Sequence, residues 1–295
     1  MAESDTQQDQ EVKIPVLPYF FAGIITFVLG LFPSCVIVYF YYPFAKMIGL
    51  DSLFGLTAIS ILGIENFWIW FFMPGTFILA YALWIYFTGW VASLWVLFWN
   101  KRSPPVTGLF QRRFGENDVA DDRLKYYHYR GYIIKWPLWL AMKSPFPWSK
   151  YWILKKVGHN KLDKKVVYLE AFPSLEFSDL KKNATFQPGS MASSHVVDSL
   201  YGNLTLKDVI IEEDATMHCN SVLAPGAHIK ENSVLMPAAF AIKNWESKDG
   251  VDFYNGAPAR SIEGEYKGAF NRLSEGAKAL YQKEGYVLGE EIQKT

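Results

Sequence analysis

The polar segment 194–203 holds the side chain best suited to proton transfer. It contains His195, and an imidazole has an ordinary pKa of about 6.5, close to working pH. Asp198, Tyr201 and Asn203 follow in the same segment. A carboxylate can orient an imidazole, while a phenol and an amide can hold an acceptor molecule. The alternative interpretation is an ordinary polar loop, because such residues also favour turns.

Two further histidines and a cysteine are weaker candidates. His218 and His228 stand beside positions that we expect to face the interior of the fold, so their own side chains should face outward. No carboxylate or cysteine lies at a recognised ligand spacing from them, and we expect no metal site. Cys219 is more typical of a surface thiol than of a nucleophile. Since Cys35 lies far away in an apolar segment, no disulfide framework is expected.

The residues around these candidates follow a six-residue period. Large apolar residues occupy every sixth position, and a small residue stands four positions after most of them. The large positions are Leu180, Phe186, Ala192, Ile211, Met217, Leu223, Ile229, Leu235 and Ala241, and the small ones are Ala184, Ser190, Ala215, Ser221, Ala227, Ser233 and Ala239. The period fits neither a helix nor a single strand, and it indicates stacked coils with three six-residue sides. The step from Ala192 to Ile211 breaks the phase, so we expect a loop within 193–205.

The coil segments resemble the hexapeptide-repeat transferases. The resemblance lies in 211–217, 220–227 and 232–235, and in the Asn-Gly-Ala-Pro-Ala-Arg sequence at 255–260, which is similar to a closing element of many acetyltransferases in this superfamily. It covers about residues 162–262 and implies a left-handed parallel β-helix, a homotrimer and acyl transfer from a thioester. The sequence departs from the family pattern at the positions where glycine is usual, which are Glu212, His218, Ala224, Lys230 and Met236.

The resemblance also implies roles for the residues of segment 194–203. His195 would be the general base that deprotonates a hydroxyl or amine acceptor before it attacks the thioester carbonyl. Asp198, Tyr201 and Asn203 would bind substrate. Because active sites of this family commonly form between protomers of a trimer, His218 would be a further substrate-binding residue.

A second set of residues stands where family members hold coenzyme A. Ala224 and Gly226 would lie beside the pantetheine arm, and Lys243 and Arg260 would meet the phosphates as charged donors. The alternative is that these basic residues only keep the end of the coils soluble.

The first hundred residues contain two long apolar segments. Residues 14–45 and 66–100 carry no formal charge over 32 and 35 positions. Because about 20 apolar residues cross a bilayer, we expect transmembrane helices between 14 and 100. We favour two spans with 52–64 as an interfacial or re-entrant piece. The alternative is three spans joined at 74–75, with Glu65 as a carboxylate inside the membrane.

Residues 101–160 combine basic and aromatic side chains. They hold 12 basic against 4 acidic residues, a local charge of +8, although the whole chain balances 29 against 29. By the positive-inside rule this segment and everything after it should be cytoplasmic. Basic residues interleaved with rings suit the lipid headgroup layer, so we expect a collar at the membrane interface rather than a nucleic-acid site. Pro137, Pro145 and Pro147 should prevent one long helix.

The expected architecture is a disordered tail at 1–13, an α-helical transmembrane region, the collar, a left-handed parallel β-helix at 161–262 and a C-terminal capping helix at 263–295. This layout, with its histidine-bearing break, resembles one membrane-bound C-terminal unit of ε-poly-lysine synthetase and related nonribosomal peptide synthetase terminal domains. No adenylation or carrier domain accompanies it in the sequence.

Together these observations predict a membrane-anchored acyltransferase. It would move an acyl group from a thioester, coenzyme A by the resemblance, to a hydroxyl or amine acceptor at the cytoplasmic membrane face, and that acceptor could be linked to a membrane lipid. The alternative is a noncatalytic trimerising or docking module for a membrane-associated peptide synthetase or another partner. The loss of glycine from the repeats favours the alternative.

Overall fold

The computed structural model describes nine stretches of the chain and two single residues. They are 10–11, 16–50, 67–111, 113–114, 122–168, 171–172, 174–198, 203–250 and 252–262, with Glu275 and Ala279. Our expectations for 52–64, for Glu65, for most of the tail and for the capping helix, apart from the helical residues Glu275 and Ala279, fall outside the described residues. The chain forms two compact units, Met1–Asn160 with Val197–Leu204, and Lys161–Val196 with Thr205–Thr295.

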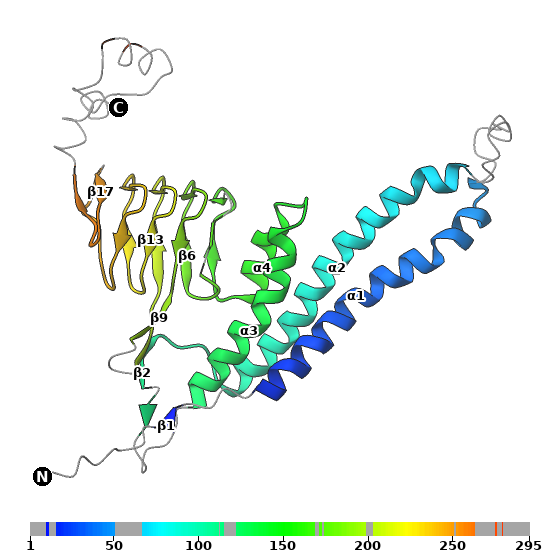
Figure 1. Cartoon of the computed structure of the whole chain (residues 1–295), viewed down its shortest axis with the longest axis horizontal. Helices are drawn as coiled ribbons and strands as arrows, with labels where there is room; N and C mark the ends of the chain where they lie inside the picture. Colours follow the sequence, from blue (N-terminus) through cyan, green and yellow to red (C-terminus); the bar gives the residue numbers. More distant parts are fainter. Residues whose placement is uncertain are drawn as a thin grey trace, which may run out of the picture. The chain divides into compact units, whose positions relative to one another are not determined.

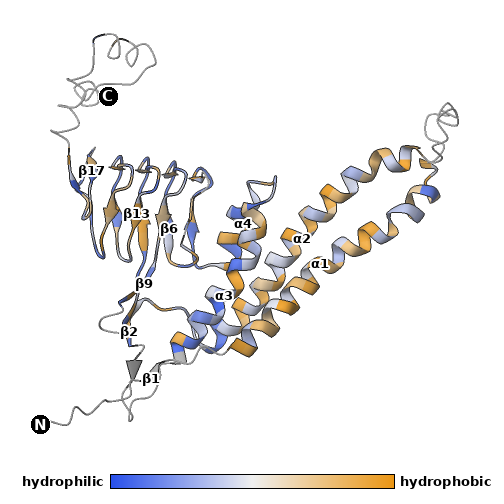
Figure 2. Ribbon diagram, in the orientation of Figure 1, coloured by the Kyte–Doolittle hydropathy of each residue, from blue (hydrophilic) through white to orange (hydrophobic). Residues whose placement is uncertain are grey.

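The first unit is built on two long apolar helices, α1 (Val16–Met47) and α2 (Phe67–Arg102) (Figure 1). Both are long and apolar enough to cross a bilayer. Large apolar side chains such as Phe32 and Trp70 are exposed along them, and apolar colour dominates both ribbons in Figure 2. α2 continues through Pro74 without a break, so the chain does not turn at the join that three spans would need.

Small residues let α1 and α2 approach closely. A Cβ atom added at Gly30 would lie 2.8 Å from the Cα atom of Thr88, so the two backbones nearly touch at this point. Further along, the Ser34 hydroxyl donates to the Ala80 carbonyl over 2.6 Å. A hydrogen bond between helices and a glycine at their crossing are typical of helix pairs that pack within a membrane.

Two shorter helices, α3 (Asp122–Met142) and α4 (Ser149–Val157), also belong to the described part of this unit. Pro145 and Pro147 lie in the break between them, as expected, but Pro137 lies inside α3 and does not end it. At Gly89 of α2 a Cβ atom would lie 2.6 Å from the Trp152 ring of α4, which shows how tightly these helices pack.

Short strands also form two small sheets apart from the three sheets of the coils. Gln10 and Glu11, which we assigned to the tail, form β1 (Gln10–Glu11) and pair antiparallel with β3 (Arg113–Phe114). A second small sheet has the order β2-β10-β9, with β2 (Gly108–Gln111), β9 (His195–Asp198) and β10 (Asn203–Leu206).

Three sheets make up the second unit, and nearly all of their strand pairs are parallel. The first sheet has the order β14-β11-β6-β4, the second β18-β17-β15-β12-β7-β5 and the third β16-β13-β8. The strands of the first sheet are β4 (Lys161–Leu162), β6 (Ser178–Leu180), β11 (Val209–Ile211) and β14 (His228–Ile229). Those of the second are β5 (Val167–Tyr168), β7 (Thr185–Phe186), β12 (Thr216–Met217), β15 (Val234–Leu235), β17 (Phe253–Asn255) and β18 (Arg260–Ser261). Those of the third are β8 (Met191–Ala192), β13 (Val222–Leu223) and β16 (Phe240–Ala241). Among the strand pairs described for these sheets, only the pair of β17 with β18 is antiparallel.

The register confirms the six-residue period. The chain visits the three sheets in turn and returns to the same sheet 18 residues later, as in the pairs Ile211 with Ile229 and Met217 with Leu235, while the last return, from Leu235 to Tyr254, takes 19. One circuit is therefore three six-residue sides, stacked on its neighbours in Figure 1. Between Leu180 and Ile211 the return takes 31 residues, because the loop out of the coils is inserted there.

The interior of the coils is filled by the residues that the period identifies. All of the large and small positions predicted from the sequence are exposed at 3% or less. Large side chains of successive coils meet in the interior, and the rings of Tyr168 and Phe186 stack with centroids 4.6 Å apart. Because each apolar side chain is buried only against neighbouring coils, the stack gains stability as coils are added.

The residue before each small position adopts a left-handed backbone conformation. The residues concerned are Asn183, Gly189, Asp214, Asn220, Gly226, Asn232 and Ala238, with φ between 58° and 79°, and Asn244, before Trp245, continues the series with φ 57°. Asn, Asp and Gly tolerate this conformation, whereas alanine is strained in it. The turns at the coil corners thus explain a second six-residue pattern in the sequence.

Candidate functional site

His195 lies where the chain leaves the coils. It is the first residue of β9, directly after the turn that follows β8, so the interruption falls within the predicted range 193–205. Its side chain is exposed, and the Ser193 hydroxyl donates to the His195 carbonyl over 2.6 Å. The coil therefore presents an accessible imidazole at the base of the loop.

Hydrogen bonds hold the start of this loop against the coils. The buried Ser194 donates its backbone N–H to the Ser174 hydroxyl over 3.2 Å. Its carbonyl accepts from the backbone N–H of Lys207 over 2.9 Å, which joins the outgoing and returning ends of the loop. The residue before His195 is thus held by hydrogen bonds to both Ser174 and Lys207.

The other residues of segment 194–203 are not all brought to His195. Alternate residues of a strand face opposite sides, so Asp198, three positions further along β9, projects from the other face. This geometry does not suit a carboxylate that orients the His195 ring directly. Asn203 begins β10 and is half-buried, and Tyr201 lies outside the described residues.

Part of the predicted coenzyme A set lies at the same corner of the coils. We define the 3–1 corner as residues 224–227 and 242–245, which link the third sheet to the first. Residues 193–194 occupy this corner one circuit earlier, because the N–H of Ser193 donates to the Leu223 carbonyl over 2.9 Å. Ala224, Gly226 and Lys243 therefore lie along the corner from which the His195 loop emerges.

The backbone at the 3–1 corner is closely approached by side chains. Gly226 has a φ of +79°, and a Cβ atom there would lie 2.6 Å from the side-chain oxygen of Asn244. The Lys207 ammonium donates to that same oxygen. Lys207 was not among the predicted residues, and it adds a second lysine beside Lys243. The sequence feature that marks Lys207 is its position at the point where the loop returns to the coils.

Arg260 follows Ala259, whose carbonyl accepts from the indole N–H of Trp245 at this corner over 2.9 Å. It is exposed on β18, where it pairs with Asn255 in the second sheet. Arg260 thus lies on the last strand of the second sheet, one residue from a contact with the 3–1 corner.

His218 occupies a different corner, between the second and third sheets. We define the 2–3 corner as residues 187–190 and 218–221. The Nδ1 atom of His218 lies 2.9 Å from the side-chain oxygen of Gln187, to which the Cys219 thiol also donates over 3.3 Å. Burial lowers the pKa of His218, so its ring is neutral at pH 7. The pairing of Gln187 with His218 could not be predicted from the sequence, because the inserted loop separates the two residues by 31 positions.

His228 is engaged on the outer face of the first sheet. Its Nε2 atom lies 2.7 Å from a Glu212 oxygen and its Nδ1 atom 3.5 Å from a Glu246 oxygen. Within the described stretches, no group of three His, Cys, Asp or Glu side chains could hold a metal ion.

Comparisons with known proteins give structural similarity but no sequence relative. No family model and no curated protein matches the chain. A hexapeptide-repeat-containing acetyltransferase from Vibrio cholerae, solved with acetyl coenzyme A, is 14% identical with a TM-score of 0.37, over 50% of this chain and 93% of that one. A maltose O-acetyltransferase from Clostridium difficile is 15% identical with a TM-score of 0.33, over 45% and 84%. The N-acyltransferase AntD from Bacillus cereus, solved with a dTDP-amino sugar and coenzyme A, is 13% identical with a TM-score of 0.32, over 39% and 71%.

Proposed function

We propose that this chain is a membrane-anchored acyltransferase whose second unit is a left-handed parallel β-helix of the hexapeptide-repeat type. It transfers an acyl group from a coenzyme A thioester to a hydroxyl or amine acceptor at the cytoplasmic membrane face. The observation that carries the proposal is the position of His195. The coils are interrupted once among the described residues, and the interruption begins with an exposed imidazole at the corner that Gly226 and Lys243 share.

His195 acts as the general base. Its neutral ring takes the proton from the acceptor O–H or N–H while the oxygen or nitrogen forms a bond to the thioester carbonyl carbon. The carbon–sulfur bond then breaks, and the leaving thiolate takes the proton from the imidazolium. The products are an ester or amide and free coenzyme A, and the histidine returns to its neutral state.

The donor lies along the 3–1 corner in this proposal. The pantetheine arm is proposed to run along this corner beside Ala224 and Gly226, outside the side chains of Asn244 and Lys207 that pack against Gly226. Lys243 and Lys207 supply ammonium groups for the phosphates, since charge-assisted hydrogen bonds are stronger than neutral ones. Arg260, on the last strand, is proposed as a contact with the far end of the donor.

We expect three copies of the chain to assemble through the third sheet. Its outward residues form an apolar ladder in direct register, from Phe172 through Met191 and Val222 to Phe240. Phe172 is 60% exposed, and Met191 and Phe240 are 40% and 37% exposed. An exposed apolar stripe of this kind marks an interaction surface.

This assembly would complete the site. The third sheet is bordered on one side by the 3–1 corner with His195 and on the other by the 2–3 corner with His218. Copies that pack through this sheet around a threefold axis bring the His218 corner of one chain to the His195 corner of the next. His218 then contacts substrate held by a neighbouring copy.

The oligomer is tested by placing a charge on the ladder. Val222→Glu should convert the trimer to monomers in analytical ultracentrifugation of the detergent-solubilised protein. Thr216→Glu, on the outward side of β12 in the second sheet, is the matched control and should stay trimeric. A monomeric wild type would exclude the shared site.

In this proposal, α1 and α2 anchor the enzyme in a membrane, and the anchoring favours an acceptor that is linked to lipid. A soluble catalytic unit tethered to the bilayer meets a lipid-linked acceptor at high effective concentration. The resemblance to the membrane units of ε-poly-lysine synthetase adds an amine acceptor as one form of this proposal.

The second candidate is a noncatalytic docking module. The side chains that replace glycine along the coils, together with the apolar ladder, favour this function. Isothermal titration of coenzyme A into the solubilised full chain separates the two. The enzyme proposal expects saturable binding that weakens about ten-fold in Lys243→Gln, the size of one charge-assisted hydrogen bond. The exposed Lys164→Gln serves as the control and should bind normally. A wild type without saturable heat would indicate a docking module.

A further inference from the structure

A pocket of about 350 Å³ opens in the helical unit where α1 begins, α2 ends and α3 begins. Its lining includes Phe21 of α1, Trp95 and Arg102 of α2, and Lys125 and Tyr126 of α3. All of these residues belong to one compact unit. The volume lies within the range of about 300–1,000 Å³ that small-molecule sites occupy.

One side of this pocket is positively charged. Arg102 and Lys125 are both exposed, and no described carboxylate forms an ion pair with either of them. The Arg102 guanidinium lies 4.0 Å from the centroid of the Phe98 ring, which holds it at the end of α2. Two cations that face one pocket attract an anion, and phosphate is the group that arginine and lysine bind best together.

The other side is apolar and rigid. Trp99 and Tyr129 both line the pocket, and their rings stack with centroids 5.2 Å apart. Phe21 is 57% exposed and lies in the first turns of α1, so the apolar wall continues onto the outer surface of the helix pair. A ligand that fits both sides has a charged head and a hydrocarbon body.

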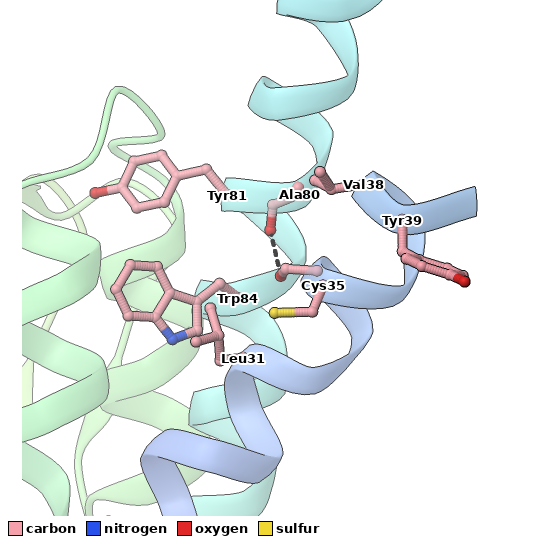
Figure 3. Close-up of a pocket in the computed structure, with 8 residues that line it drawn as sticks. Leu31, Cys35, Val38, Tyr39, Ala80, Tyr81 and Trp84 are labelled. Atoms are coloured by element: carbon pink, nitrogen blue, oxygen red, sulfur yellow. Dashed lines mark hydrogen bonds between the residues drawn. The ribbon is translucent and has the colours of Figure 1, made fainter. Parts of the chain in front are cut away.

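A second pocket in the same unit provides a contrast (Figure 3). It measures about 470 Å³ between α1 and α2, and apolar and aromatic residues such as Leu31, Val38 and Trp84 line it. The dashed line in the figure is the hydrogen bond between the α1 and α2 residues Ser34 and Ala80. None of the described residues that line this cavity is charged, so they give it no means of selecting a headgroup.

From this arrangement we infer that the pocket beside Arg102 and Lys125 binds the headgroup of an anionic phospholipid. The phosphate lies between the two cations, and the acyl chains follow the apolar side of α1 and α2. The position fits, because the ends of two bilayer-length helices meet there and a basic pocket between such helices is suited to anionic lipid. The inference rests on the membrane anchoring proposed above and not on acyl transfer.

The test uses the full-length protein in nanodiscs that contain equal amounts of phosphatidylglycerol and phosphatidylcholine, with retained lipid counted by native mass spectrometry. The wild type should retain phosphatidylglycerol in excess. Arg102→Gln/Lys125→Gln should reduce that excess on the order of ten-fold, given the usual attraction of two basic residues for an anionic surface. The charge-preserving Arg102→Lys/Lys125→Arg should keep most of it.

A matched pair, Lys101→Gln/Lys135→Gln, removes the same charge from exposed positions outside the pocket lining and should leave the excess unchanged. An equal loss in this pair, or no lipid preference in the wild type, would overturn the site. Displacement of the lipid by millimolar inorganic phosphate would also overturn it, because a free anion would then be the ligand. Failure of the wild type to remain in the membrane fraction would instead count against anchoring.

Discussion

His218 and Gln187 form a hydrogen bond of 2.9 Å across two successive coils. Because the Gln187 oxygen is the acceptor, the Nδ1 atom of His218 carries the hydrogen and its Nε2 atom keeps a lone pair. Burial lowers the pKa of this histidine, so the lone pair is available at neutral pH. The 2–3 corner thus presents an acceptor to any hydroxyl or amine that approaches it.

If His218 holds the acceptor substrate, its loss should affect binding more than chemistry. His218→Ala should raise the KM for the acceptor about ten-fold, the value of a hydrogen bond left unmade, with little change in kcat. Cys219→Ser, at the next position, is the control and should keep both constants. Steady-state kinetics with varied acceptor measures the effect, and a fall in kcat at unchanged KM would contradict a binding role.

The stability of the helical unit should depend on His159. Its Nε2 atom lies 3.1 Å from the amide nitrogen of Asn100, and burial, with the nearby Arg130 charge, lowers its pKa to about 4. Between about pH 6.5 and 4 the unfolded chain therefore binds a proton that the folded chain does not. The free energy of unfolding should fall as pH drops through this window. His159→Gln should make urea unfolding less dependent on pH there, and an unchanged slope would contradict the argument.

The contact of Gly30 with Thr88 predicts a sharp steric effect. Gly30→Leu should separate α1 from α2 and lower the unfolding temperature of the detergent-solubilised protein by several degrees, as loss of close packing does. Gly75→Leu is matched, because nothing lies within 4 Å of a Cβ atom there. Equal destabilisation by the two substitutions would show that the helices do not pack at Gly30.

Ala238 is the one alanine among the left-handed corner residues described in the coils. Ala238→Asn should raise the free energy of unfolding by about 0.5–1 kcal/mol, because asparagine tolerates this backbone conformation. The reciprocal change, Asn232→Ala at the equivalent position one side earlier, should lower it by a similar amount. Chemical unfolding monitored by circular dichroism would refute the strain argument if both variants changed stability in the same direction.

The coils could be predicted from the sequence because burial alone determines their pattern. Each circuit buries one large residue per side, so Ile211, Met217 and Leu223 reveal the period without any knowledge of neighbours. The two apolar helices were equally clear, since their length and lack of charge follow from composition. Of the three prolines expected to prevent one long helix, Pro145 and Pro147 lie in the break between α3 and α4, whereas Pro137 lies inside α3.

The site was harder to predict than the coils. The break in phase predicted the position of the loop that begins at His195, but the opposite facing of Asp198 depends on a strand that the loop composition did not reveal. Gln187 was hidden because its partner His218 lies beyond the inserted loop. Roles for Lys207, Arg102 and Lys125 could not be predicted from the sequence, because their neighbours come from distant segments of the chain.

The central claim is tested most directly by removing the imidazole of His195. Release of free coenzyme A from acetyl coenzyme A would be followed with the membrane-reconstituted protein in the presence of amine and hydroxyl acceptors. His195→Ala should lower the rate at least about a hundred-fold, the usual contribution of a general base, while coenzyme A still binds. His228→Ala, a histidine already engaged by Glu212 and Glu246, should retain the wild-type rate. An unchanged rate in His195→Ala would contradict the proposed mechanism.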